Sequence, residues 1–163
     1  MGRSSSVTSC LLLLASTVST GRARETSPRI PPQQVATKVS ECAFPNTQKP
    51  WRVDNTCKAI LDDVAQRLQQ DPESTLVVVG NSAPTDTGKD LAAKRAVNVK
   101  TYLTGGEAKQ GIDPSRIKTY TGNGGSKTVD FWILPASANF SEKNTKPVDE
   151  HTVKAIPDRP SHR

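Results

Sequence analysis

Hydrophobic residues are concentrated in the middle of the chain, and their spacing changes from one segment to the next. In residues 53–68 they recur every three or four positions, which predicts an amphipathic helix with one buried face. The predicted buried stripe contains Val53, Cys57, Ile60, Leu61, Val64, Ala65 and Leu68. Asp54 stands at the expected N-cap position and Asp71-Pro72 ends the pattern, so we expect the first helix to lie between them.

A continuous apolar run and a second helical pattern follow. Residues 76–79 are Leu-Val-Val-Val and are closed by Gly80, a composition typical of a central strand that is covered on both faces. From Thr87 to Leu103 the apolar residues return to helical spacing, and Gly105-Gly106 is a typical helix end. The predicted buried stripe is Ala92, Ala96, Val99 and Leu103, with Leu91, Arg95 and Tyr102 beside it.

Three further segments are predicted to be strands. Residues 39–44 form the first, ended by Pro45, and residues 117–121 and 129–134 form the last two, with a glycine-rich turn between them. The predicted order is βαβαββ, an α/β sandwich with helices packed on a mixed parallel and antiparallel sheet. We expect the first crossover to join parallel strands and the last two strands to pair as a hairpin.

The two ends of the chain lack these patterns. Residues 1–23 resemble a signal peptide, with Arg3, a short apolar run at residues 11–15 and small residues after it. Cys10 precedes the apolar run instead of following it, which argues against lipidation. The alternative is a wrongly assigned start, or a fragment whose true signal lies upstream. We expect a Pro-rich linker at residues 24–38, the domain at 39–136 and a disordered basic tail at 137–163.

Cys42 and Cys57 are the cysteines that remain if the signal peptide is removed. An even pair of cysteines in a small exported domain predicts a disulfide. Closing a loop of this length stabilises a fold by about 3 kcal/mol in the chain-entropy model. Both histidines, His151 and His162, lie in the polar tail, and no Cys-x-x-Cys pair exists, so we expect neither a zinc site nor a cofactor.

The composition narrows the function classes further. The net charge is +6, but Lys and Arg are scattered without a dense block or interleaved aromatic residues, so nucleic acid is not an expected partner. Residues 39–136 contain no histidine, which leaves no evident base for nucleophilic chemistry. Residues 122–128 are Gly-Asn-Gly-Gly-Ser-Lys-Thr, but a predicted strand follows them, so we expect a turn and not a phosphate loop. The protein is therefore expected to be non-catalytic.

Residues 91–99, Leu-Ala-Ala-Lys-Arg-Ala-Val-Asn-Val, carry the most specific motif in the chain. They follow a predicted strand that ends in Gly80, and Gly111-Ile112 comes after them. This arrangement resembles the OmpA-like C-terminal domain, whose signature is Gly-x-x-Asp at a strand end and Asn-x-x-Leu-Ser-x-x-Arg-Ala-x-x-Val on the next helix. The matching residues are Gly80, Leu91, Arg95, Ala96 and Val99. The resemblance covers residues 39–135 and agrees with the predicted order of elements.

The resemblance implies non-covalent binding of peptidoglycan, which would tether the outer membrane or envelope assemblies to the wall from the periplasm. In the family the helix Arg takes the carboxylate of diaminopimelate in the stem peptide, and the loop Asp takes its ammonium. Arg95 matches the first role, and a planar guanidinium suits it. The family's Asp position is Ala83 here, and Asp86 in the same loop is the candidate for the second role. The alternative is an interaction module that keeps the fold, has lost peptidoglycan binding and contacts other envelope proteins.

Overall fold

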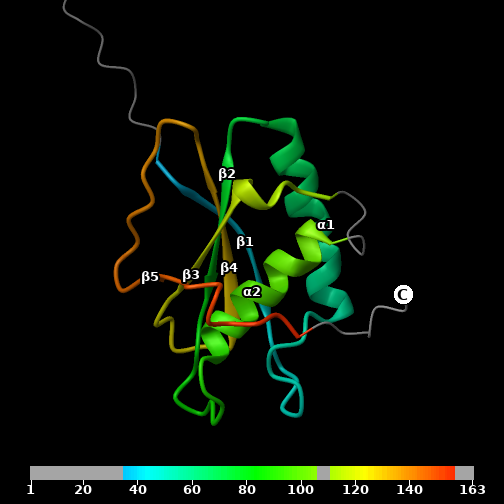
Figure 1. The fold of residues 1–163 in the computed structure, drawn as a ribbon, viewed down its shortest axis with the longest axis vertical. Coiled ribbons are helices and arrows are strands. Elements are labelled where there is room, and N and C mark those ends of the chain that lie inside the picture. The colour runs from blue at the N-terminus through cyan, green and yellow to red at the C-terminus, as the bar shows by residue number, and fades with distance from the viewer. Residues whose placement is uncertain (1–34, 106–110, 157–163) are drawn as a thin grey trace, which may run out of the picture. The chain divides into compact units, whose positions relative to one another are not determined.

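The structure, a computed structural model, describes residues 35–105 and 111–156 (Figure 1). The elements in chain order are β1 (Thr37–Ala43), α1 (Asn55–Gln70), β2 (Thr75–Gly80), α2 (Leu91–Thr104), a 3-10 turn (Pro114–Arg116), β3 (Ile117–Thr121), β4 (Thr128–Leu134) and β5 (Lys146–Pro147). This is the expected combination of two helices and a mixed sheet. The predicted signal peptide and most of the predicted linker lie outside the described residues.

The five strands form one sheet in the order β1-β4-β2-β3-β5. β4 pairs antiparallel with both β1 and β2, so β1 and β2 run in the same direction, as expected. The predicted hairpin of the last two long strands is wrong, because β3 pairs in parallel with β2 and β4 lies on the other side of β2. The reason is burial: Phe131 is completely buried and Leu134 nearly so, which suits a central strand better than an edge strand.

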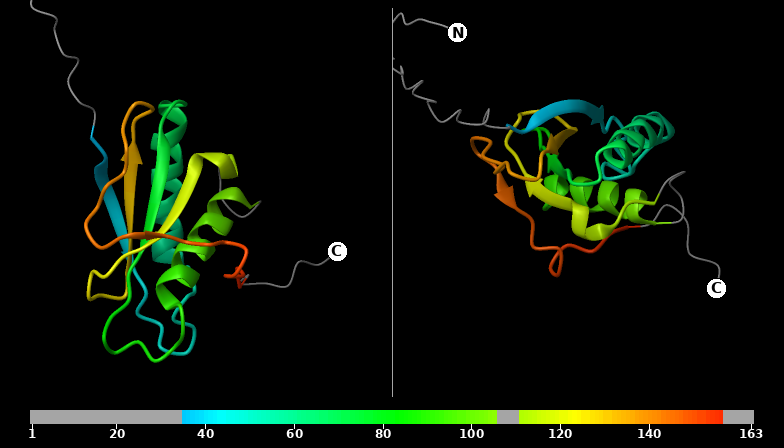
Figure 2. Two further views of the ribbon diagram at one scale, coloured as in Figure 1. Left: turned by 60° about the vertical axis from the view of Figure 1, so that its left-hand side comes forward. Right: turned by 90° about the horizontal axis from the view of Figure 1, so that it is seen from above.

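Both helices lie on the same side of the sheet (Figures 1 and 2). They pack there on one face of the central strands, and this layer holds the main hydrophobic core. Its fully buried members include Leu61, Leu68, Leu76, Val78, Val99, Leu103, Val129 and Phe131. In residues 35–105 and 111–156, neither helix has the length and apolar composition needed to cross a lipid bilayer.

The two helices begin differently. At α1 the Asp54 side chain accepts a hydrogen bond from the Cys57 N–H at 2.8 Å, which confirms the predicted N-cap. α2 begins at Leu91, four residues after the expected start, and Asp90 before it has a left-handed φ of 57° with no side-chain cap. The cause lies in the preceding loop, where the Asp86 N–H donates to the Ala83 carbonyl at 2.9 Å and closes a turn. Residues 82–90 are therefore loop.

Cys42 and Cys57 form the predicted disulfide, with an S–S distance of 2.03 Å. It joins β1 to the first turn of α1, and both residues are buried in the main core. The edge strand of the sheet is thus covalently attached to the helical layer.

We call residues 137–156 the C-terminal strap. They belong to the tail that was predicted to be disordered, but the structure shows them packed on the domain. Residues 157–163 lie outside the described residues. The first part of the strap lies on the sheet face opposite the helices, where Phe140 packs on Tyr120 at 5.0 Å and on Trp132 at 5.9 Å between ring centroids. The strap then adds β5 beside β3. Because β2 is apolar on both faces, with Val77 and Val79 buried on this side, the second face also needs a cover.

Candidate functional site

Arg95, the residue matched to the family's carboxylate-binding arginine, is completely buried. Its Nε donates to the Pro50 carbonyl at 2.8 Å, and one guanidinium nitrogen donates to the Asn81 carbonyl at 2.7 Å. The guanidinium carbon also lies 5.6 Å from the centre of the Phe44 ring. Arg95 therefore ties α2 to the chain before α1 and to the end of β2.

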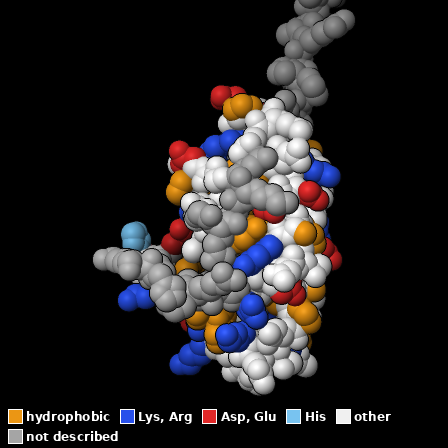
Figure 3. All heavy atoms as spheres, turned by 90° about the vertical axis from the view of Figure 1, so that its right-hand side faces the viewer, with side chains coloured by type: hydrophobic (Ala, Val, Ile, Leu, Met, Phe, Trp, Pro, Cys, Tyr) orange, Lys and Arg blue, Asp and Glu red, His pale blue; other side chains and the backbone are white. Residues whose placement is uncertain are grey.

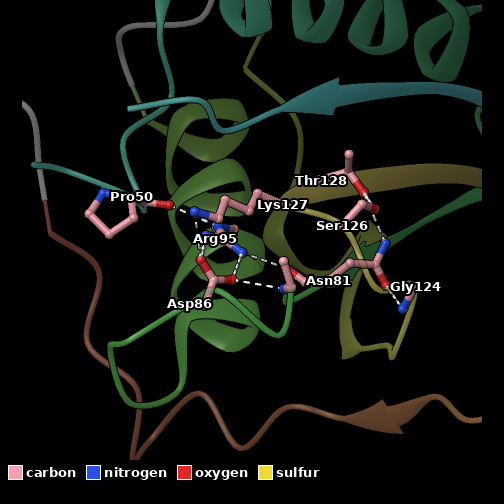
Figure 4. A network of polar contacts seen from close by, with 9 residues as sticks. Pro50, Asn81, Asp86, Arg95, Gly124, Ser126, Lys127 and Thr128 are labelled. Carbon is pink, nitrogen blue, oxygen red and sulfur yellow. Dashed lines mark hydrogen bonds and ion pairs between the residues drawn. The ribbon is translucent and has the colours of Figure 1, made fainter. Parts of the chain in front are cut away.

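Asp86 completes the environment of Arg95 (Figure 4). Its two carboxylate oxygens accept from the two terminal nitrogens of Arg95 at 2.8 and 2.9 Å, a bidentate ion pair. The Ala83 N–H donates to the same carboxylate at 3.0 Å, and the Lys127 ammonium lies 3.7 Å away. Hydrogen bonding from Arg95, above all, lowers the pKa of Asp86 to about 2. The structure thus brings together both predicted site residues, and it joins them to each other.

Asn81 is a site residue that the sequence analysis did not identify. Its side-chain nitrogen donates to Asp130 Oδ2 at 2.8 Å and to Thr128 Oγ1 at 3.3 Å, while its side-chain oxygen accepts from the Gly124 N–H at 3.1 Å. A Cβ at Gly122 would lie 2.5 Å from that oxygen, so any larger residue there would force Asn81 or the turn to shift. The glycine-rich turn is therefore packed around Asn81. The sequence feature that could have identified Asn81 is its place as a polar residue directly after a buried strand.

Gly80 sets the distance between β2 and α2. A Cβ on Gly80 would lie 2.0 Å from the backbone oxygen of Ala92 and 3.2 Å from the Ala96 Cβ. Gly80 and Ala96 both belong to the motif that resembles the OmpA-like domain. Glycine at the strand end and alanine on the helix therefore allow the close approach that brings Arg95 to the Asn81 carbonyl.

A cavity of about 450 Å³ opens beside this network. Its walls come from the loop 82–90, the first turn of α2, residues 121–123 after β3, and the C-terminal strap. Three of the described residues that line it are charged: Asp86, Asp90 and Lys146. Arg95 does not line it. The cavity thus offers groups of both signs to a small polar ligand, with the buried ion pair behind one wall.

The surface of the domain also carries charged side chains of both signs outside the cavity. On the described part of the face in Figure 3, several Lys and Arg side chains gather in the lower half, whereas Asp and Glu side chains lie mostly above them and along the right-hand edge, with scattered hydrophobic residues between. Within residues 35–105 and 111–156, no three His, Cys, Asp or Glu side chains gather as metal ligands would. The polar cavity and the ion pair beside it are therefore the candidate functional site.

No protein-family model matches the chain, and no curated protein matches it significantly. The motif in residues 91–99 and the geometry of the cavity are the features of the chain that bear on its function.

Proposed function

We propose that this chain is a divergent OmpA-like, non-catalytic domain of the bacterial cell envelope that binds peptidoglycan non-covalently. It would tether the outer membrane or envelope assemblies to the wall. The observation that carries the proposal is Asp86: Arg95 holds this carboxylate ionised at the wall of a polar cavity. An ionised carboxylate at a fixed position is the group that recognises the ammonium of a diaminopimelate side chain.

The order of the elements supports the same proposal. Residues 91–99 lie on a helix that follows a strand ending in Gly80, which is the context that the OmpA-like motif requires. The disulfide supports an envelope location, because such bonds form and persist in oxidising compartments such as the periplasm.

The roles of the two site residues differ from those that the resemblance implies. In the described part of the chain, Arg95 uses four of its five N–H donors on Pro50, Asn81 and Asp86. It is therefore a positioning residue, and the ligand need not touch it. Asp86 accepts three hydrogen bonds there, whereas a carboxylate has about four acceptor positions. The remaining position lies on Oδ1, which the Lys127 ammonium approaches only to 3.7 Å, beyond hydrogen-bond distance. A ligand ammonium would take this position, so that Asp86 has the role of the acidic residue that is missing at Ala83.

Retention of the purified protein on insoluble sacculi that contain diaminopimelate tests the proposal. The parent is expected to sediment with the sacculi, and Asp86→Asn to bind at least about fivefold more weakly, since a charged hydrogen-bond partner is lost. Asp63→Asn, which removes an exposed carboxylate from α1, is the matched control and should bind like the parent. Circular dichroism must show that each variant is folded at the assay temperature. A parent that stays in the supernatant overturns the proposal.

The engagement of Arg95 by groups of the protein itself favours one second candidate, an interaction module that keeps the fold but no longer binds peptidoglycan. Under that candidate the ion pair is purely structural, and the cavity has no stem-peptide ligand. Ala83→Asp separates the two, because position 83 lines the same cavity and matches the family's acidic residue. A gain in binding of a soluble diaminopimelate peptide supports the binding domain, whereas no binding before or after the substitution supports the module.

A further inference from the structure

The C-terminal strap reaches the cavity through β5. Thr121, which lines the cavity, pairs with Lys146, and Tyr120 pairs with Pro147. The Thr121 hydroxyl also donates to the Lys146 carbonyl at 3.4 Å. Asn144, two residues earlier, adopts a left-handed φ of 65° and lines the cavity too. The chain beyond the predicted domain boundary therefore builds part of the cavity wall.

Contacts on both sides of Lys146 fix its backbone. Before it, Phe140 packs on the aromatic side chains of β3 and β4. After it, the Val148 N–H donates to the Thr119 carbonyl at 3.0 Å, and the Glu150 carboxylate accepts from the Thr119 hydroxyl at 2.7 Å. Glu150 also accepts from the Lys100 ammonium at 2.9 Å. A strap held at these points presents Lys146 at a defined place on the cavity rim.

The charges around the cavity single out the same residue. Diaminopimelate carries a carboxylate beside its ammonium, and a cationic side chain binds a carboxylate more strongly than a neutral donor does. Arg95 is behind the wall and is engaged by Asp86. Among the described residues that line the cavity, Lys146 is the one basic side chain. An ammonium on a flexible stem can reach a carboxylate at the rim.

We infer that Lys146 is the residue that binds the carboxylate of the ligand, so that the C-terminal strap is part of the binding site. The inference rests on the proposed function and names the residue that gives it specificity. Lysine in a stem peptide has the same terminal ammonium as diaminopimelate but lacks the adjacent carboxylate. The domain should therefore prefer diaminopimelate to lysine, and Lys146 should produce the preference.

Titration with two soluble stem peptides, identical except for diaminopimelate or lysine at the third position, tests the inference. The parent is expected to bind the diaminopimelate peptide about five- to tenfold more tightly, the effect of one charged hydrogen bond at a partly solvated site. Lys146→Ala should abolish this preference by weakening the binding of the diaminopimelate peptide to about the affinity of the lysine peptide. Lys143→Ala, an exposed lysine in the same strap that does not line the cavity, should keep the preference.

The outcomes separate the inference from the proposed function. A Lys146→Ala variant that keeps the parental preference overturns the inference, whereas the proposed function stands as long as the parent binds. Equal parental affinity for the two peptides also overturns the inference alone. A parent that binds neither peptide removes the proposed function, and the role of Lys146 with it.

Discussion

Arg95 on α2 and Asp86 in the loop before it form a bidentate ion pair whose side chains are 0% and 5% exposed. The pair connects the first turns of the helix to residues 82–90, and the Asn81 carbonyl connects it to the end of β2. Replacing one residue of such a buried ion pair is costly, because the charge of the other residue stays buried without a partner. The first two predictions follow from this relationship.

Replacing Arg95 should destabilise the fold strongly. Arg95→Ala leaves Asp86 buried without its main partner and opens a space beside Phe44, so we expect a loss of about 3–5 kcal/mol in the free energy of unfolding. Urea denaturation measures it. Arg67→Ala, an exposed arginine in the last turn of α1, is the control and should change stability by less than about 0.5 kcal/mol. Equal losses in the two variants would contradict the structural role of Arg95.

Acid should weaken the fold through Asp86. Its pKa falls from 3.8 to about 2 on folding, so the ionised form stabilises the protein above pH 3.8. This stabilisation, about 2.5 kcal/mol, is lost as the pH falls from about 4 to about 2. Denaturation curves across that range should show a steeper loss of stability in the parent than in Asp86→Asn. The same dependence on pH in both proteins would assign the acid sensitivity to other carboxylates.

The disulfide should contribute measurably to stability. Replacing Cys42 and Cys57 by serine removes a cross-link that closes a chain segment with a sequence separation of 15 residues. We expect a loss of about 3 kcal/mol, chiefly through the larger freedom of the unfolded chain. Reducing the parent with dithiothreitol should lower the free energy of unfolding by a similar amount and lower the unfolding midpoint with it. A midpoint that does not respond to the reductant would show that the cross-link adds little.

The glycine-rich turn offers a test of the packing around Asn81. In Gly122→Ala the new Cβ would lie 2.5 Å from the Asn81 side-chain oxygen and 2.8 Å from Val79 Cγ1, so the turn must shift. We expect a cost of about 1–3 kcal/mol, the usual range for an overpacked site. Gly111→Ala places its Cβ in open space and is the matched control. If the two variants unfold at the same urea concentration, the turn is not held against Asn81.

Local patterns in the sequence were sufficient for most of the elements, and non-local contacts account for the errors. The helical spacing in residues 53–68 and the apolar run before Gly80 each report on burial within one element. The place of β4 between β1 and β2 depends on pairing between distant strands, and no local pattern encodes it. The late start of α2 depends on Asp86, which is bonded to a side chain on the following helix.

The candidate site was predictable only in part for the same reason. The motif identified Arg95, and Asp86 was a candidate because it lies in the same loop as Ala83, but the sequence does not state that the two side chains bind one another. Lys146 was assigned to a tail because residues 137–163 are poor in hydrophobic residues. A single aromatic residue, Phe140, together with polar bonds, is what holds that segment on the sheet.

The ring of Phe140 attaches the C-terminal strap to the sheet. Phe140→Ala removes the ring that packs on Tyr120 and Trp132, at an expected cost of about 1–2 kcal/mol for a partly buried aromatic side chain. Trp132 should become more exposed, so tryptophan fluorescence should shift to longer wavelength. The same variant should also weaken the preference for diaminopimelate, because Lys146 loses its fixed position although it is unchanged. Unaltered fluorescence and stability would show that the strap does not depend on this contact.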